Sequence, residues 1–200
     1  SDPAMFANRY TALVDACTLV SAPRRDLLLT LAEAEFFRVR WSQRILDETQ
    51  NALGRIFAER GIEDSASRAA RSVGAMHRAF PEALVMAHTS LASMTFGLPD
   101  ANDEHVLAAA VQTQAQAVVT ENIADFPEAV LTPLNIEART ADEFIADTIA
   151  LDEGKAVAAI RTLRTRLTRP EMSAEGYLRS LEAHGLFVTA SLLNNHIESI

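Results

Sequence analysis

Residues 103–125 read DEHVLAAAVQTQAQAVVTENIAD, and this stretch decides the fold class. Apolar residues recur at helical spacing over 106–115 and predict a helix with Asp103 near its first turn. The run Ala117–Thr120 predicts a short buried strand directly afterwards. A helix that leads into a buried strand is typical of a sheet in which strands alternate with helices.

The segments that precede this stretch show the same alternation. Ala12–Val14 predicts a short buried strand, Asp26–Ala34 a helix and Phe36–Arg40 a second strand. We therefore predict an α/β fold with a parallel sheet flanked by helices. Sites in such sheets form beyond the carboxyl ends of the strands, where Asp15 and Asn122 are expected.

The helix predicted after Ser42 carries another acidic candidate. Ser42 is suited to be its N-cap, and Gly61 is suited to end it. At about 100° per residue, Glu48 lies about 60° from the apolar Ile45, whereas Asp47 lies about 160° away. The pattern therefore selects Glu48 as the inward carboxylate of this helix.

The remaining segments up to residue 150 give weaker signals. A further amphipathic helix is predicted over 62–80, and residues 83–94 fit neither helix nor strand clearly. Leu98-Pro99-Asp100 predicts a loop. Thr140-Ala-Asp-Glu143 has the capping-box pattern and predicts the start of another helix.

The chain is predicted to be wholly helical from about Leu151. Arg169-Pro170 interrupts the pattern, Ser173 can cap the next helix, Gly185 ends it, and a last helix follows over about 186–197. We expect a main domain over 9–150 and a helical extension over 151–200, which is too small to fold alone. Residues 1–8 are a lead-in, and Ser1-Asp-Pro-Ala before Met5 is typical of an expression remnant.

Composition excludes several classes of protein. The net charge of −9 argues against simple non-specific affinity for nucleic acid. Neither glycine-rich nucleotide-binding motif occurs, and the five histidines lack zinc-ligand spacing. Lys155, the only lysine, is misplaced for a phospho-acceptor receiver domain. Cys17 is the only cysteine, which favours a reducing compartment, and no apolar run is long enough for a membrane span, so we expect a cytoplasmic protein.

Four acidic positions in comparable settings are the main functional signal. They are Asp15, Glu48, Asp103 and Asp125, each at a predicted strand end or helix start. Carboxylates brought close together repel one another and raise each other's pKa. A divalent cation relieves that repulsion, so the pattern predicts a site for a hard metal ion.

These segments, in this order, resemble the PIN-domain nucleases, particularly the VapC-like toxins of bacterial toxin–antitoxin pairs. The resemblance covers roughly residues 9–147 and rests on four stretches: Val14–Leu19, Trp41–Leu53, Leu98–Ala110 and Val119–Pro127. It implies a three-layer α/β/α nuclease domain, and the tail resembles an extension found in one subset of the family. It also implies a metal-dependent endoribonuclease, with RNA as substrate, a small antitoxin as partner and possible homodimers.

The resemblance also assigns roles to residues. Asp15, Glu48 and Asp103 would hold one or two Mg²⁺ or Mn²⁺ ions, Asn122 or Asp125 would complete the site, and Thr120 would orient it. Asp125 would share in catalysis with the first three. Guanidinium groups suit phosphate, so arginines near the Glu48 helix are expected to bind RNA. These arginines are Arg38, Arg40 and Arg44.

Two positions depart from the family pattern. Cys17 stands where an amide or hydroxyl residue is common, and Asn122 stands where many members have Asp. The number of metal ions therefore stays open. Asn122 and the acidic charge leave open a first alternative, a catalytically degenerate module that binds protein. A second alternative is a phosphohydrolase of the haloacid-dehalogenase type. The second is disfavoured because Cys17 occupies the position of its second Asp.

Each candidate also has an ordinary structural explanation. Asp100 and Asp103 could both be helix caps, an explanation that the resemblance overrides for Asp103 only. His105 is expected to be a polar surface residue, and Cys17 a small packed one. The arginines between Arg161 and Arg169 are expected to form a solvated helix face.

Overall fold

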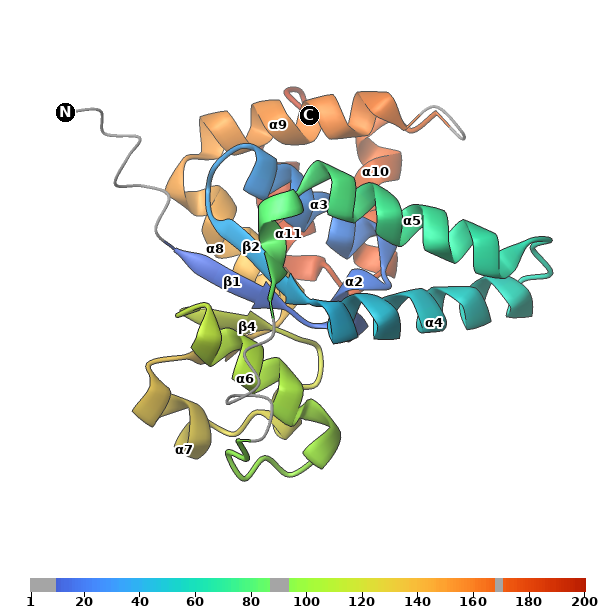
Figure 1. Cartoon of the computed structure of the whole chain (residues 1–200). Helices are drawn as coiled ribbons and strands as arrows, with labels where there is room; N and C mark the ends of the chain where they lie inside the picture. The colour runs from blue at the N-terminus through green and yellow to red at the C-terminus, as the bar shows by residue number, and fades with distance from the viewer. Residues whose placement is uncertain (1–9, 87–93, 168–170) are drawn as a thin grey trace. The chain divides into compact units, whose positions relative to one another are not determined.

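Five strands form one sheet in the part of the chain that the structure describes. This computed structural model describes residues 10–86, 94–167 and 171–200. The strand order is β3-β2-β1-β4-β5 (Figure 1). The strands are β1 (Thr11–Val14), β2 (Arg38–Ser42), β3 (Leu84–Val85), β4 (Ala117–Val119) and β5 (Glu137–Arg139). The predicted α/β fold, with a parallel sheet flanked by helices, is confirmed.

The parallel pairing brings two predicted site segments to the same edge. β1 pairs with β4 in register, with Leu13 opposite Val118 and Val14 opposite Val119. The pairing continues one residue further, because the backbone N–H of Asp15 donates to the carbonyl of Val119 at 3.0 Å. Asp15 and Thr120 therefore both follow the carboxyl ends of neighbouring strands.

The chain divides into two compact units. The sheet unit comprises residues 11–20 and 39–138. Its helices are α2 (Ala16–Leu19), α4 (Gln43–Glu59), α5 (Ser65–Ala79), α6 (Glu104–Gln112) and α7 (Glu128–Leu131). Its short 3-10 turns are η1 (Pro81–Ala83), η2 (Ala101–Asp103), η3 (Ile123–Asp125) and η4 (Thr132–Leu134). In this unit α6 packs against β1 and β4.

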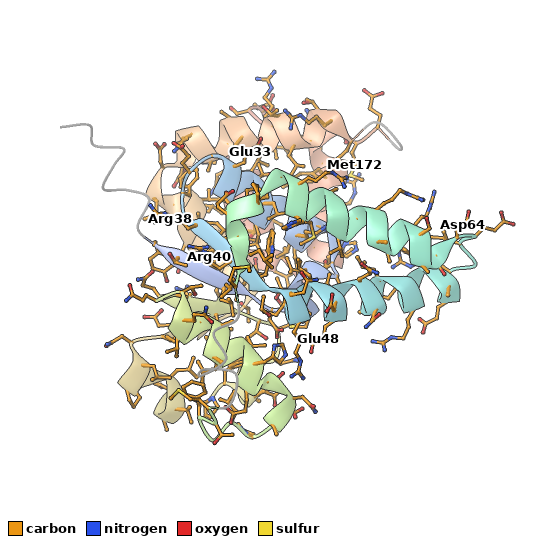
Figure 2. The ribbon with its side chains drawn as sticks, viewed as in Figure 1. Glu33, Arg38, Arg40, Glu48, Asp64 and Met172 are labelled. Carbon is orange, nitrogen blue, oxygen red and sulfur yellow. The ribbon has the colours of Figure 1, made fainter. Side chains whose placement is uncertain are left out.

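Helices α4 and α5 form the most extensive helix pair of the sheet unit. They lie side by side, and Asp64 lies at the turn that joins them (Figure 2). The helices are close at Gly54, where a Cβ would lie 4.0 Å from the Cβ of Ala69, an ordinary packing distance. At the turn, Gly61 takes a positive φ of 67°, which suits the residue that ends α4.

The helical unit contains residues 21–38 and 139–200 together with Tyr10. Its helices are α3 (Ala22–Glu33), α8 (Ala141–Leu151), α9 (Glu153–Arg166), α10 (Ala174–Ala183) and α11 (Phe187–Asn194). The leucine face of α3 is fully buried, and α3 packs against both α8 and α9. The carboxylate of Asp142 in α8 accepts the backbone N–H groups of Val188 and Thr189, which begin α11.

Most predicted helix boundaries agree with the structure, with small shifts. Ser42 caps α4, Ser173 caps α10, and Thr140 and Glu143 form the predicted capping box of α8. Helix α3 begins four residues earlier than predicted, and β2 lies two residues later. The predicted break at Arg169-Pro170, and most of the unassigned stretch 83–94, lie outside the described residues.

The predicted domain boundaries at 9–150 and 151–200 stay a prediction, and the compact units interleave differently along the chain. Helix α3, inside the predicted main domain, packs with the helices of the predicted extension. Among the described residues, no helix is long and apolar enough to cross a membrane.

Candidate metal-binding site

Asp15 is a buried carboxylate held by several hydrogen-bond donors. It is only 5% exposed and caps α2, because its Oδ1 accepts the backbone N–H of Ala16 at 2.7 Å. Its Oδ2 accepts the hydroxyl of Thr120 at 2.9 Å. Thr120 is fully buried, and its Oγ1 also accepts the backbone N–H of Asn122 at 3.1 Å. Thr120 therefore joins Asp15 to the turn that carries Asn122 and Asp125.

Cys17 lies beside the same carboxylate but stays protonated. Its Sγ lies 3.2 Å from Asp15 Oδ2 and 3.3 Å from the hydroxyl of Thr120. Burial and the negative charge of Asp15 raise the pKa of the Cys17 thiol to about 11. A thiol with this pKa is not a nucleophile at neutral pH, which agrees with its interpretation as a packed residue.

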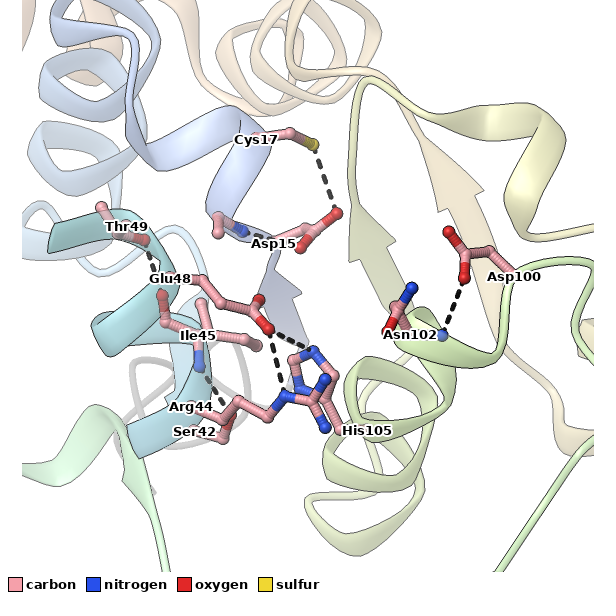
Figure 3. Close-up of polar contacts among 11 residues, drawn as sticks. Asp15, Cys17, Ser42, Arg44, Ile45, Glu48, Thr49, Asp100, Asn102 and His105 are labelled. Atoms are coloured by element: carbon pink, nitrogen blue, oxygen red, sulfur yellow. Dashed lines mark hydrogen bonds and ion pairs between the residues drawn. The ribbon is translucent and has the colours of Figure 1, made fainter. Parts of the chain in front are cut away.

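Glu48 is half-buried, with its side chain 39% exposed, whereas Asp47 is exposed, so the helical pattern ranks the two carboxylates correctly. One oxygen of Glu48, Oε1, contacts two cationic or donor groups (Figure 3). Arg44 Nε lies 3.1 Å from it, and His105 Nε2 also lies 3.1 Å from it. The contact joins α4 to α6, because His105 belongs to the first turn of α6.

The prediction that His105 is a surface residue is wrong. Its side chain is only 15% exposed, and it contacts Glu48 instead of solvent. Burial and the nearby positive charge of Arg44 lower the pKa of His105 to about 4, against the opposing effect of Asp15. The imidazole is therefore neutral at physiological pH.

Asp103 and Asp100 differ as the sequence predicts. Asp100 is a cap: its Oδ1 accepts the backbone N–H of Asn102 at 2.8 Å. Asp103 stands at the N-cap position of α6 but makes no capping hydrogen bond with its side chain. Burial and the negative charges of four other carboxylates together raise the pKa of Asp103 to about 6; burial has the largest effect, followed in order by Asp15, Asp100, Asp125 and Glu48.

The loop before Asp103 is anchored by its neighbour Glu104. The carboxylate of Glu104 accepts the backbone N–H groups of Phe96, Gly97 and Leu98 at 2.7–2.9 Å. Gly97 has a positive φ of 81°, which allows the chain to wrap around the carboxylate. The side chain of Glu104 therefore helps to fix the backbone of the loop that leads to η2.

The sequence profile of the PIN domain matches residues 11–124, more than half of the chain. The chain belongs to the PIN-domain family. The profile of the VapC50 C-terminal domain matches residues 141–195, so the helices that follow the PIN domain are a recognised extension. These matches confirm the predicted resemblance.

A curated relative of this PIN-domain chain is known from Mycobacterium tuberculosis (strain ATCC 25618 / H37Rv). That protein, named "Putative ribonuclease VapC50", is 35% identical over 79 residues, which cover 40% of this chain and 47% of the relative. The chain thus spans about half the length of the curated relative it matches. A comparison with solved structures finds no match.

The remaining residues predicted for the PIN-domain site differ in their surroundings. Asn122 is exposed and begins η3 without a capping hydrogen bond from its side chain, and Asp125 is half-buried at the end of η3. The guanidinium of Arg40 donates to the backbone carbonyl of Glu82, whereas that of Arg44 pairs with Glu48. Arg38 is exposed, and its contact with RNA stays a prediction.

The chemistry of these residues fits a hard divalent cation. The donors are carboxylate oxygens, and burial together with their mutual repulsion raises the pKa of Asp103. As the side chains are placed, no three His, Cys, Asp or Glu residues among the described residues lie close enough together to hold a metal ion. Glu48 is instead occupied by Arg44 and His105.

Sequence reasoning missed two residues near this site. His105 was assigned to the surface because its partner, Glu48, lies 57 positions away and no local pattern connects the two. Glu104 received no role, although three consecutive backbone groups converge on it. The one sequence feature that could have indicated both residues is the consecutive polar run Asp103-Glu104-His105.

Proposed function

We propose that this PIN-domain chain is a metal-dependent endoribonuclease and the toxin of a toxin–antitoxin pair. The observation that carries the proposal is the group of acidic side chains around Asp103. Asp15, Glu48 and Asp125 come from three other segments; burial of Asp103 and the charges of these neighbours raise its pKa. Repulsion between carboxylates destabilises the folded chain, and a cluster of this kind is typical of a functional site. A bound divalent cation would neutralise the repulsion.

In this proposal each residue of the site has a separate role in binding the cation. Asp15, Glu48 and Asp103 hold the cation, and Asn122 or Asp125 completes its shell. Thr120 keeps the Asp15 carboxylate oriented through its 2.9 Å hydrogen bond. Bound Mg²⁺ or Mn²⁺ would supply Lewis-acid chemistry toward a phosphodiester and lower the pKa of water.

The charge of the chain is compatible with RNA as substrate in the presence of such an ion. A bound cation reverses the local field of the pocket, so a protein of net charge −9 can accept a phosphodiester there. We include Arg38, Arg40 and Arg44 as proposed contacts to the RNA backbone. A small antitoxin, action in the cytoplasm and a homodimer are further parts of the proposal that follow from the family.

The proposal is tested with matched pairs of acidic residues. Asp15→Asn, Glu48→Gln and Asp103→Asn should abolish Mn²⁺ binding by calorimetry and RNA cleavage. The controls Asp47→Asn and Asp100→Asn change neighbouring carboxylates that face solvent or cap a turn, and they should retain both activities. Loss of an outer-shell partner already costs about 10- to 100-fold in metal affinity or activity, so loss of a ligand should cost more.

The result also separates the nuclease from a degenerate binding module. Cleavage by the unaltered chain that EDTA abolishes and Mn²⁺ restores supports the nuclease. A folded chain that neither binds Mn²⁺ nor cleaves RNA would leave only the binding module.

A further inference from the structure

The contact between His105 and Glu48 joins α4, which bears Glu48, to α6, which begins directly after Asp103. Glu48 lies in α4, and Asp103 immediately precedes α6, two positions before His105. His105 Nε2 lies 3.1 Å from Glu48 Oε1, which is within hydrogen-bonding distance (Figure 3). Because Asp103 lies only two positions before His105, this contact also helps to fix the position of Glu48 relative to Asp103.

Arg44 contacts the same oxygen but is less able to fix it. Arg44 lies one turn before Glu48 on the same helix, and its side chain is 55% exposed. Exposed pairs of this kind contribute little, because solvent screens them and two long side chains must be ordered. His105 has a short, planar side chain that is 15% exposed and comes from a different element.

The chemistry of the imidazole restricts the contact to one form. A carboxylate oxygen accepts hydrogen bonds, so Nε2 must carry a proton to contact Glu48 Oε1 at 3.1 Å. The other ring nitrogen, Nδ1, is buried and has no hydrogen-bond partner among the described residues. The ring is thus held at Nε2 by Glu48, with no competing protein donor or acceptor at Nδ1 in the described part of the chain.

We propose that His105 is a positioning residue for Glu48. Its Nε2–H holds Glu48 Oε1 and thereby leaves the other carboxylate oxygen available to the cation of the proposed nuclease. The inference rests on the proposed function for that cation, but the contact itself does not depend on it. Carboxylate ligands of metal ions are commonly oriented by outer hydrogen-bond partners of this kind.

Three substitutions at one position separate positioning from packing. His105→Gln can place an amide N–H near the position of Nε2, whereas His105→Asn reaches only the position of Nδ1. His105→Phe retains the ring volume without any donor. We expect Mn²⁺ affinity by calorimetry to fall about 10- to 100-fold in His105→Asn and His105→Phe. It should stay within about threefold of the unaltered chain in His105→Gln.

A second measurement tests the contact without metal. Long-range ¹H–¹⁵N NMR spectra of the EDTA-treated chain should show His105 as the Nε2–H tautomer, and Glu48→Ala should shift the Nε2 resonance. The Nδ1–H tautomer, or no shift in Glu48→Ala, would overturn the proposal, as would unchanged Mn²⁺ affinity in His105→Asn. If the unaltered chain binds no Mn²⁺, the proposed function fails, and the NMR result alone decides the contact.

Discussion

Asp103 is a carboxyl group whose charged form the folded chain disfavours. Its pKa is raised to about 6 by burial and by four neighbouring carboxylates, so its charged form is disfavoured in the folded chain. The folded state therefore binds a proton more tightly than the unfolded state does. The stability that the protonated form provides is present below about pH 4 and is lost as pH rises through about 6.

This linkage predicts that Asp103→Asn stabilises the metal-free chain at pH 7.5. The substitution removes a repelled charge, and the gain should shrink as the pH falls through about 6 and approach zero below about 4, where Asp103 becomes protonated in the unfolded chain as well. Urea denaturation in EDTA across this range measures the effect. Asp100→Asn is the control: its amide oxygen can still accept the N–H of Asn102 and cap η2, so it should change the stability much less than Asp103→Asn does. A gain for Asp103→Asn that does not depend on pH would contradict the explanation.

At the level of single residues, local sequence patterns predict orientation well and distant partners poorly. The 100° period of a helix distinguishes Glu48 from Asp47, and the structure agrees. The sequence also predicts that Asp15 has bonding partners, because it ends a buried strand and a buried carboxylate is costly without them. The contact between His105 and Glu48 could not be predicted, because it arises where two separate helices meet.

Among the elements, the turn before α6 depends most on one side chain. Glu104 satisfies three successive backbone N–H groups, those of Phe96, Gly97 and Leu98. Charge-assisted hydrogen bonds of this type are stronger than neutral ones, and unsatisfied N–H groups are costly when they are removed from water. The geometry of η2 and of Asp103 therefore depends on this carboxylate.

Glu104→Ala should lower the free energy of unfolding by about 1–3 kcal/mol, because three donors lose their acceptor together. The amide N–H groups of 96–98 should also lose protection against hydrogen exchange before the rest of the sheet unit does. Glu104→Gln, which keeps one acceptor oxygen, is the matched control and should have a smaller effect. Equal protection in the unaltered chain and in Glu104→Ala would show that the three bonds do not hold the turn.

The elements that the sequence predicted are the long or strongly patterned ones. Helices α4, α5 and α6 have enough turns to show a 3.6-residue period, and their caps are chemically distinct. The two-residue β3 and three-residue β5 were not predicted, because so few residues show no alternation. Helix α3 begins earlier than predicted because Pro23 occupies its first turn, where proline is favoured and not disruptive.

Considered as a whole, the helical unit is assembled from two distant parts of the chain. Leu27, Leu28 and Leu31 of α3 are fully buried, and α3 packs against α8 and α9. Burial of each leucine contributes about 1.5–3 kcal/mol, a large share of the roughly 5–15 kcal/mol by which a domain is stable. The sequence predicted the extension but could not show which helix it packs against.

Truncation after Leu151 should therefore destabilise residues 10–151 and not merely remove an appendage. Loss of α9 exposes part of the leucine face of α3, so we expect a lower melting temperature and aggregation, measured by circular dichroism and light scattering. Residues 152–200, supplied as a separate chain, should restore part of the solubility. A soluble truncated chain with an unchanged melting temperature would show that α9 contributes nothing to the stability of α3.

During synthesis, α3 leaves the ribosome well before α9, the helix that it packs against. About 120 residues separate the end of α3 at Glu33 from the start of α9 at Glu153. At about 5–20 residues per second, a ribosome needs roughly 6–24 seconds to cover that distance. During this interval the leucines of the nascent chain lack their final partner, so a chaperone has time to bind them before the last helices emerge.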